Sequence, residues 1–135
     1  MKASALPWPG SPPALTALLM FACAVVVALQ TASPSRAVML LALAPWLEET
    51  VFRAGLQEHL LRSGRRPWLC NALTALAFAA AHTLAWQQWS GAVLVLPALA
   101  LGTLYQRTRS VTACAAAHAA MNGVWLALSA LGLHL

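Results

Sequence analysis

Two adjacent glutamates, Glu48 and Glu49, lie inside an apolar run that begins at Ala37, and Arg53 follows four residues after Glu49. The chain has three acidic residues in total, all of them glutamates, so keeping two together in this run needs a reason. Residues i and i+4 share a face of a helix, so Glu49 and Arg53 can form an ion pair. Glu48 points about 100° away on the same helix and must find its partner on another helix.

Two histidines and one asparagine are the other strongly polar groups expected at membrane depth. His82 ends the sequence Phe78-Ala-Ala-Ala-His82, and His118 opens His118-Ala-Ala-Met-Asn122. The i, i+4 spacing places His118 and Asn122 on one face, where both can donate hydrogen bonds to one point. A carboxylate such as Glu48 and a histidine can together take a proton from water. A second histidine and an amide can stabilise an oxyanion, which completes a set for amide hydrolysis without a covalent intermediate.

The composition indicates that these groups are carried by an integral membrane protein. Of the 135 residues, 61% are hydrophobic and 8% are charged, whereas soluble proteins average about 25% charged residues. The predicted fold class is therefore all-α, a polytopic membrane bundle of about five transmembrane helices. The three cysteines are expected to be small packing residues. The basic residues are not interleaved with aromatic ones, so a nucleic-acid partner is not expected.

The apolar runs and the breaks between them predict where the helices lie. Residues 1–35 comprise a proline-containing lead-in and a first charge-free transmembrane helix, and residues 36–135 form a four-helix core. Gly64 is expected to end one helix and Pro67 to begin the next. Pro45 and Pro97 are expected to kink the helices that contain them. The predicted spans are residues 14–31, 36–61, 67–86, 91–106 and 110–133.

The basic residues are distributed unevenly between the two sides of this predicted bundle. Only Arg36 falls near a boundary on one side. The other side collects Lys2, Arg62, Arg65, Arg66, Arg107 and Arg109. By the positive-inside rule this bias places the N-terminus in the cytoplasm and the C-terminus outside, in a multi-pass protein of the inner (plasma) membrane.

The ordered motifs resemble those of the CPBP intramembrane proteases. This family includes the type II CAAX prenyl endopeptidases and bacteriocin-processing or bacteriocin-immunity proteins, also called the Abi family. The resemblance rests on Glu48-Glu49-Thr-Val-Phe-Arg53, Phe78-Ala-Ala-Ala-His82 and His118-Ala-Ala-Met-Asn122, in that order. It covers about residues 40–130 and leaves the first predicted helix outside. Many members carry glycine directly after the motif arginine, whereas Ala54 precedes Gly55 here.

The resemblance implies a role for each motif residue in a glutamic-type endopeptidase. Glu48 would be the general base, acting with His82 on the attacking water. His118 and Asn122 would form the oxyanion hole. The supporting residues implied are Glu49, Arg53 and Phe78. The implied partners are the lipid bilayer and a membrane protein or peptide, lipidated or carrying a C-terminal sorting signal, with no cofactor. Because the chain is short, a homodimer could supply parts that larger relatives carry.

Two other hypotheses remain open. A zinc hydrolase could use Glu48, His82 and His118 as a two-histidine, one-carboxylate site, although the sequence contains no His-Glu-x-x-His. A non-enzymatic membrane protein, for partner binding, immunity or a proton path, could keep the same polar core for packing or relay. In that case Glu49 with Arg53 is a structural ion pair, and His118 with Asn122 holds helices together.

Overall fold

The computed structural model describes residues 34–130 and residue 132, and within this part of the chain every regular element is a helix. The predicted first helix, residues 14–31, and the stretch before it lie outside the described residues. The first five elements follow one another without a break and form one long helix over residues 34–62. They are α2 (Pro34–Val38), η1 (Met39–Leu43), α3 (Ala44–Glu49), η2 (Thr50–Gln57) and α4 (Glu58–Arg62). The all-α prediction is confirmed.

Two segments of the long helix, η1 and η2, have the wider π-helical turn, in which hydrogen bonds span five residues instead of four. In η1, the backbone N–H of Ala44 bonds the carbonyl of Met39, five positions earlier. Pro45 follows and has no N–H to continue this ladder. The backbone disturbance expected at Pro45 is therefore a π segment that precedes it. The second segment directly follows Glu49, which fits the tendency of π turns to occur at functional sites.

A short turn connects the long helix to α5 (Pro67–Trp86). The boundaries of α5 are those predicted from the sequence. Gly64 has a φ of 76°, a left-handed conformation that costs little only for glycine. Pro67 occupies the start of α5, where a missing N–H has no consequence. Helix α5 ends at Trp86, and Gln87, the residue that follows it, also adopts a left-handed conformation. The polypeptide then turns back toward the end where α5 began.

The return path consists of a 3₁₀ turn, η3 (Trp89–Leu94), followed by α6 (Val95–Thr108). Pro97 lies in the first turn of α6, a place where proline is tolerated, rather than inside a continuous helix. The change from 3₁₀ to α geometry thus takes the place of the kink expected at Pro97. Gly91 in η3 is in close contact with α5, because a Cβ at this position would lie 2.6 Å from the backbone nitrogen of Thr83.

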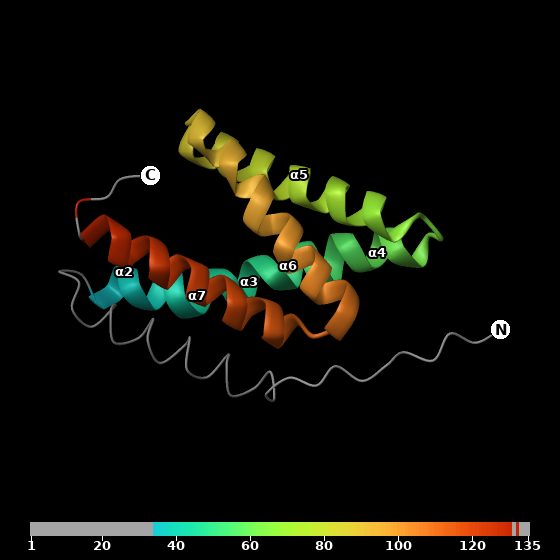
Figure 1. Ribbon diagram of the computed structural model, residues 1–135, viewed down its shortest axis with the longest axis horizontal. Helices are drawn as coiled ribbons and strands as arrows, with labels where there is room; N and C mark the ends of the chain where they lie inside the picture. Colours follow the sequence, from blue (N-terminus) through green and yellow to red (C-terminus); the bar gives the residue numbers. More distant parts are fainter. Residues whose placement is uncertain (1–33, 131, 133–135) are drawn as a thin grey trace.

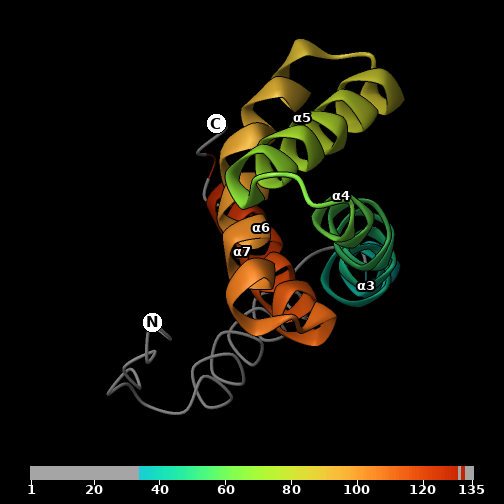
Figure 2. The ribbon, with the colours of Figure 1, turned by 90° about the vertical axis from the view of Figure 1, so that its right-hand side faces the viewer.

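The last helix, α7 (Val111–Ala130), completes the bundle, and the two halves of the long helix pack mainly on different helices. The first half of the long helix, η1 and α3, packs on α7, and the second half, η2 and α4, packs on α5. Helix α6 lies beside both α5 and α7 (Figure 1). Figure 2 looks along the long helix and shows α5 above it, with α6 and α7 beside it to the left. The middle of the long helix, which carries Glu48 and Glu49, is therefore where α5 and α7 both come near.

The bundle buries polar groups and exposes large apolar ones, as expected of a protein whose outer surface meets lipid. The buried polar or charged residues are Glu49, Arg53, Gln57, Asn71, Thr74 and His118. Exposed apolar residues include Leu47 on the long helix, Leu84 on α5 and Leu96 on α6. Among the described residues, three helical stretches are long and apolar enough to cross a membrane: Pro67–Trp86, Trp89–Thr108 and Val111–Ala130. The chain is thus a polytopic membrane protein.

Candidate active site

Glu49 is fully buried and accepts hydrogen bonds from two basic side chains, one on its own helix and one on α7. Its Oε2 accepts a hydrogen bond from Nε of Arg53 at 2.7 Å, which confirms the predicted i, i+4 ion pair. Its Oε1 accepts one from Nδ1 of His118 on α7 at 2.9 Å. Arg53 is also completely buried. A carboxylate with both oxygens occupied in this way is a structural acceptor, and it fixes the orientation of the His118 ring.

Gln57, one turn further along the long helix, extends this buried chain of hydrogen-bonded side chains. It was not among the site residues predicted from the sequence. Its Oε1 accepts a hydrogen bond from Nη1 of Arg53 at 3.3 Å. Its Nε2 donates to the carbonyl of Gly102 on α6 at 3.0 Å. The signal was present, because Gln57 is a polar residue four positions after Arg53 and eight after Glu49. Gln57 thus connects the motif glutamate to the third helix of the bundle.

Glu48 lies at the meeting point of the two histidines. Its Oε2 is 3.6 Å from Nε2 of His82 and 3.8 Å from Nε2 of His118. This oxygen is buried and has no hydrogen-bond partner among the described residues, whereas the Glu48 side chain as a whole is 27% exposed. The structure thus brings Glu48, His82 and His118 together at one point, and part of the Glu48 side chain stays exposed. Both separations are too long for direct hydrogen bonds.

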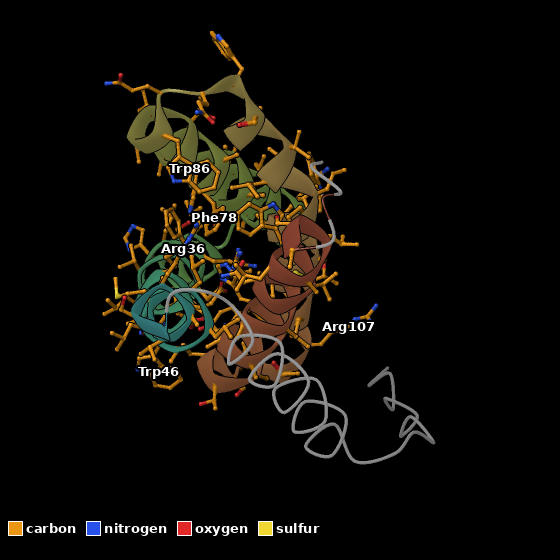
Figure 3. All side chains as sticks on the ribbon, turned by 90° about the vertical axis from the view of Figure 1, so that its left-hand side faces the viewer. Arg36, Trp46, Phe78, Trp86 and Arg107 are labelled. Carbon is orange, nitrogen blue, oxygen red and sulfur yellow. The ribbon has the colours of Figure 1, made fainter. Side chains whose placement is uncertain are left out.

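His82 is fixed by its own helix. Its Nδ1 lies 2.9 Å from the carbonyl oxygen of Phe78, one turn earlier on α5. The Phe78 ring stacks on the His82 ring with centroids 4.3 Å apart, and it meets His118 edge-on at 5.8 Å. On the other side, Trp86 packs edge-on against His82 at 5.1 Å. Figure 3 shows Phe78 and Trp86 on the same side of α5, near the long helix. Phe78 therefore aligns both histidine rings.

The hydrogen-bond partners assign the same tautomer to both neutral histidines. A carbonyl oxygen and an ion-paired carboxylate can only accept, so Nδ1 of His82 and Nδ1 of His118 must each carry a hydrogen. In the neutral rings both Nε2 atoms are then acceptors, and both face the acceptor oxygen of Glu48. Three acceptor atoms directed at one region require a donor between them, such as a water molecule or an added proton.

Asn122 on α7 bonds to the backbone of the long helix. Its Nδ2 donates to the carbonyl oxygen of Leu40 at 2.8 Å. Leu40 follows Met39 in the π segment, and the residue five positions after it is Pro45, which has no N–H. The side chain of Asn122 therefore supplies a hydrogen bond that Pro45 withholds from the backbone. The expectation that Asn122 and His118 donate to one point stays a prediction.

A separate apolar groove of about 220 Å³ lies between the long helix and α7. Leu41, Ala42 and Trp46 line it on one side, and the opposite wall is formed by Thr112, Ala115, Ala116 and Ala119. Figure 3 shows Trp46 on the outer side of the long helix, away from Phe78 and Trp86. The groove contains none of the residues of the acid–histidine cluster. Within the described residues, no group of three His, Cys, Asp or Glu side chains could hold a metal ion.

Comparison with known protein families gives a match for this all-helical membrane bundle. The chain belongs to the type II CAAX prenyl endopeptidase Rce1-like family, whose model matches residues 13–124. Curated proteins give no significant match, and neither do solved structures. Family membership supports CAAX protease-type hydrolysis in the membrane as the class of activity.

The family match corrects one expectation from the motifs. The resemblance was expected to begin near residue 40 and to leave the first predicted helix outside. The match begins at residue 13 and therefore includes residues 14–31. That helix carries no charged residue, so it offered no motif through which the resemblance could have been noticed.

Proposed function

We propose that the protein is an intramembrane endopeptidase that hydrolyses a peptide bond of a membrane-associated protein or peptide with an activated water molecule. The observation that carries the proposal is the convergence of both Nε2 atoms on Oε2 of Glu48, a buried oxygen without a hydrogen-bond partner among the described residues. A purely structural acid is expected to have its oxygens occupied, as those of Glu49 are. Glu48 differs from Glu49 in this respect, although the two are adjacent.

Glu48 and His82 would act together on the water. A water molecule between Oε2 of Glu48 and Nε2 of His82 can donate one hydrogen to each, which leaves its oxygen lone pair directed at the substrate. As the water oxygen bonds to the scissile carbonyl carbon, one of its protons moves to Glu48. When the carbon–nitrogen bond then breaks, that proton passes to the leaving nitrogen, and the products are a carboxylic acid and an amine. No group is consumed, and no covalent intermediate is needed.

His118 would stabilise the oxyanion of the tetrahedral intermediate. Its Nδ1–H is held by Glu49, so a protonated His118 presents Nε2–H toward the site and keeps a carboxylate partner for its charge. Asn122 was expected to share this task. Its bond to Leu40 supports a different role, in which Asn122 holds η1 against α7 and so positions the helix that carries Glu48. Arg53 and Phe78 would act through Glu49 and the two histidine rings.

The substrate would reach Glu48 from the lipid side of the bundle. The exposed apolar residues Leu84 and Trp86 lie on α5 next to His82, which supports an apolar approach to the site. A lipidated protein or a peptide with a C-terminal sorting signal fits such a surface, and a second copy of the chain could complete it. We place the protein in the inner (plasma) membrane, with the N-terminus cytoplasmic and the C-terminus outside, from the distribution of its arginines.

The test is to map protein termini in membranes of the native cells, with wild type or Glu48→Gln expressed at matched levels. New termini present only with wild type are expected, and they would identify both the substrate and the cleavage site. Glu58→Gln, which changes the third glutamate far from the histidines, is the matched control and should leave the new termini in place. Identical termini with wild type and Glu48→Gln would reject proteolysis and favour the binding or immunity hypothesis.

Zinc chemistry is the alternative to be tested, because Glu48, His82 and His118 are the kinds of ligand that zinc prefers, although their arrangement in the described residues does not form a metal site. The purified enzyme is assayed on the identified substrate before and after exhaustive chelation. Activation of water by Glu48 and His82 alone predicts that the activity survives. Loss of activity that added zinc restores would replace that mechanism with metal activation of water.

A further inference from the structure

One end of the bundle carries most of the positive charge of the described residues. Two connections meet there, the turn between α4 and α5 and the junction between α6 and α7. The arginines at this end are Arg62, Arg65, Arg66, Arg107 and Arg109. All five are exposed. The only acidic residue near them is Glu58, so this end has an excess of four positive charges.

Glu58 forms ion pairs with two of these arginines, and the other three have no such partner among the described residues. Its Oε1 accepts a hydrogen bond from Nε of Arg62 at 2.9 Å, and its Oε2 accepts one from Nη1 of Arg109. The hydroxyl of Tyr105 donates to the same Oε2 at 3.1 Å. The remaining three, Arg65, Arg66 and Arg107, have no side-chain partner among the described residues, and Figure 3 shows Arg107 extending away from the bundle. We refer to these three residues as the arginine surface.

The two connections are held together, so the arginine surface is one surface and not two separate loops. Nε2 of Gln106 donates to the carbonyl of Pro67 at 2.6 Å, which links the residues next to Arg107 with those next to Arg66. The ion pair between Glu58 and Arg109 makes a second link between the same parts of the chain. Figure 1 shows both connections at the same end of the molecule.

This surface lies at the boundary of the membrane-spanning segments. One apolar span begins at Pro67, directly after Arg66, and another ends at Thr108, directly after Arg107. Trp68 is 64% exposed beside them, and exposed tryptophans are typical of the headgroup level of a bilayer. Three unpaired guanidinium groups at this level lie where the phosphates of lipid headgroups are found. Guanidinium also matches phosphate in geometry, since it can donate two parallel hydrogen bonds.

We propose that the arginine surface binds the phosphate headgroups of anionic glycerophospholipids. An acidic protein partner would need to reach the same depth, beside the first residue of a membrane span, whereas a headgroup is already there. The charge of the surface is not balanced by any described acidic residue, so an anionic lipid is attracted more strongly than a zwitterionic one. This site is separate from the acid–histidine cluster and does not depend on proteolysis.

The test uses the full chain reconstituted in phosphatidylcholine vesicles that contain a trace of spin-labelled phosphatidylglycerol or spin-labelled phosphatidylcholine. Electron spin resonance gives the relative association of each lipid with the protein. Phosphatidylglycerol should be preferred in the wild type, and the preference should fall about fivefold for each arginine removed in Arg65→Gln, Arg66→Gln and Arg107→Gln. Added salt should weaken it.

Arg36→Gln is the matched control, because Arg36 is an exposed arginine at the other end of the same bundle. It should leave the preference unchanged. Equal association of the two lipids with the wild type would overturn the proposal, as would an equal loss in Arg36→Gln. Displacement of the spin-labelled lipid by inorganic phosphate at millimolar concentration would reassign the surface to a soluble anion. The substituted side chains of Arg65, Arg66 and Arg107 make no hydrogen bond or ion pair among the described residues, and circular dichroism checks that each variant is folded.

Discussion

Nδ1 of His118 donates a hydrogen bond to Oε1 of Glu49 at 2.9 Å, although 69 positions separate the two residues in the chain. Because of this bond, the two adjacent glutamates have different surroundings. Glu49 is completely buried and occupied by Arg53 and His118, while Glu48 keeps an unpartnered oxygen and is partly exposed. Adjacent acids with such different surroundings are suited to different tasks, one to holding the site together and the other to chemistry.

The first prediction compares the same substitution at the two glutamates. Glu49→Gln should lower the free energy of unfolding by about 3–5 kcal/mol, because Arg53 would be left buried without its anionic partner. Glu48→Gln should leave this free energy unchanged or raise it by up to about 1 kcal/mol, because the new amide can donate to an Nε2 atom. Denaturant unfolding in detergent micelles measures both. Equal losses in the two variants would refute the division of roles.

The second prediction concerns Asn122, for which the sequence and the structure support different roles. Asn122→Leu removes the donor to the Leu40 carbonyl and should lower the free energy of unfolding by about 1–3 kcal/mol. Loss of an oxyanion donor is expected to lower turnover by about 100- to 1,000-fold. Turnover per folded molecule of Asn122→Leu should fall by much less than this. Unfolding curves and single-substrate kinetics measure the two effects. A large loss of turnover with unchanged stability would restore Asn122 to the oxyanion hole.

The third prediction concerns Gln57, the buried residue that links Arg53 to Gly102. Gln57→Leu keeps the approximate size of the side chain but leaves Nη1 of Arg53 without its partner and removes a side-chain hydrogen bond to the Gly102 carbonyl. The free energy of unfolding should fall by about 2–4 kcal/mol, since the orphaned guanidinium group is charged. Gln106→Leu removes a comparable amide near the surface and should cost less than about 1 kcal/mol. Similar losses of stability at both positions would show that the buried hydrogen bonds of Gln57 contribute little to the free energy of unfolding.

The fourth prediction tests the close contact between η3 and α5. Gly91→Ala would place a Cβ 2.6 Å and 2.8 Å from the backbone N and Cα of Thr83, so one of the two segments must move. Overpacking of this kind costs about 1–3 kcal/mol. Gly55→Ala is the control, because its nearest neighbour would be the Thr50 carbonyl at 3.6 Å, an ordinary contact. It should raise stability by up to about 1 kcal/mol through helix propensity. Thermal unfolding compares the stability of the two variants, and Gly91→Ala should be the less stable.

The parts of the fold that depend on local signals could be predicted from the sequence. Helix α5 has the predicted limits because Gly64 and Pro67 act on the backbone beside them. The ion pair of Glu49 with Arg53 follows from i, i+4 spacing within one helix, and it too was predicted. Such features need no knowledge of which helices are neighbours.

The parts that depend on helix packing could not be predicted in the same way. The partner of His118 is set by how closely α7 approaches the long helix, and spacing within α7 contains no information about that distance. The π segment before Pro45 changes which carbonyl lacks a donor, so the role of Asn122 emerges only with the backbone geometry. Gln57 had a visible signal in its spacing from Arg53, but its partner, the carbonyl of Gly102, belongs to the backbone of another helix.

All the side-chain carboxyl groups of this protein lie on one helix, residues 34–62. Infrared difference spectra of the carboxyl stretching region would therefore report on a single helix without isotope editing or background subtraction of other acids. The three groups also differ in surroundings: Glu49 is buried in an ion pair, Glu58 lies between two arginines, and Glu48 faces two imidazoles. A proton that moves onto Glu48 during turnover would be seen as one resolved band, in a protein where few other acids could obscure it.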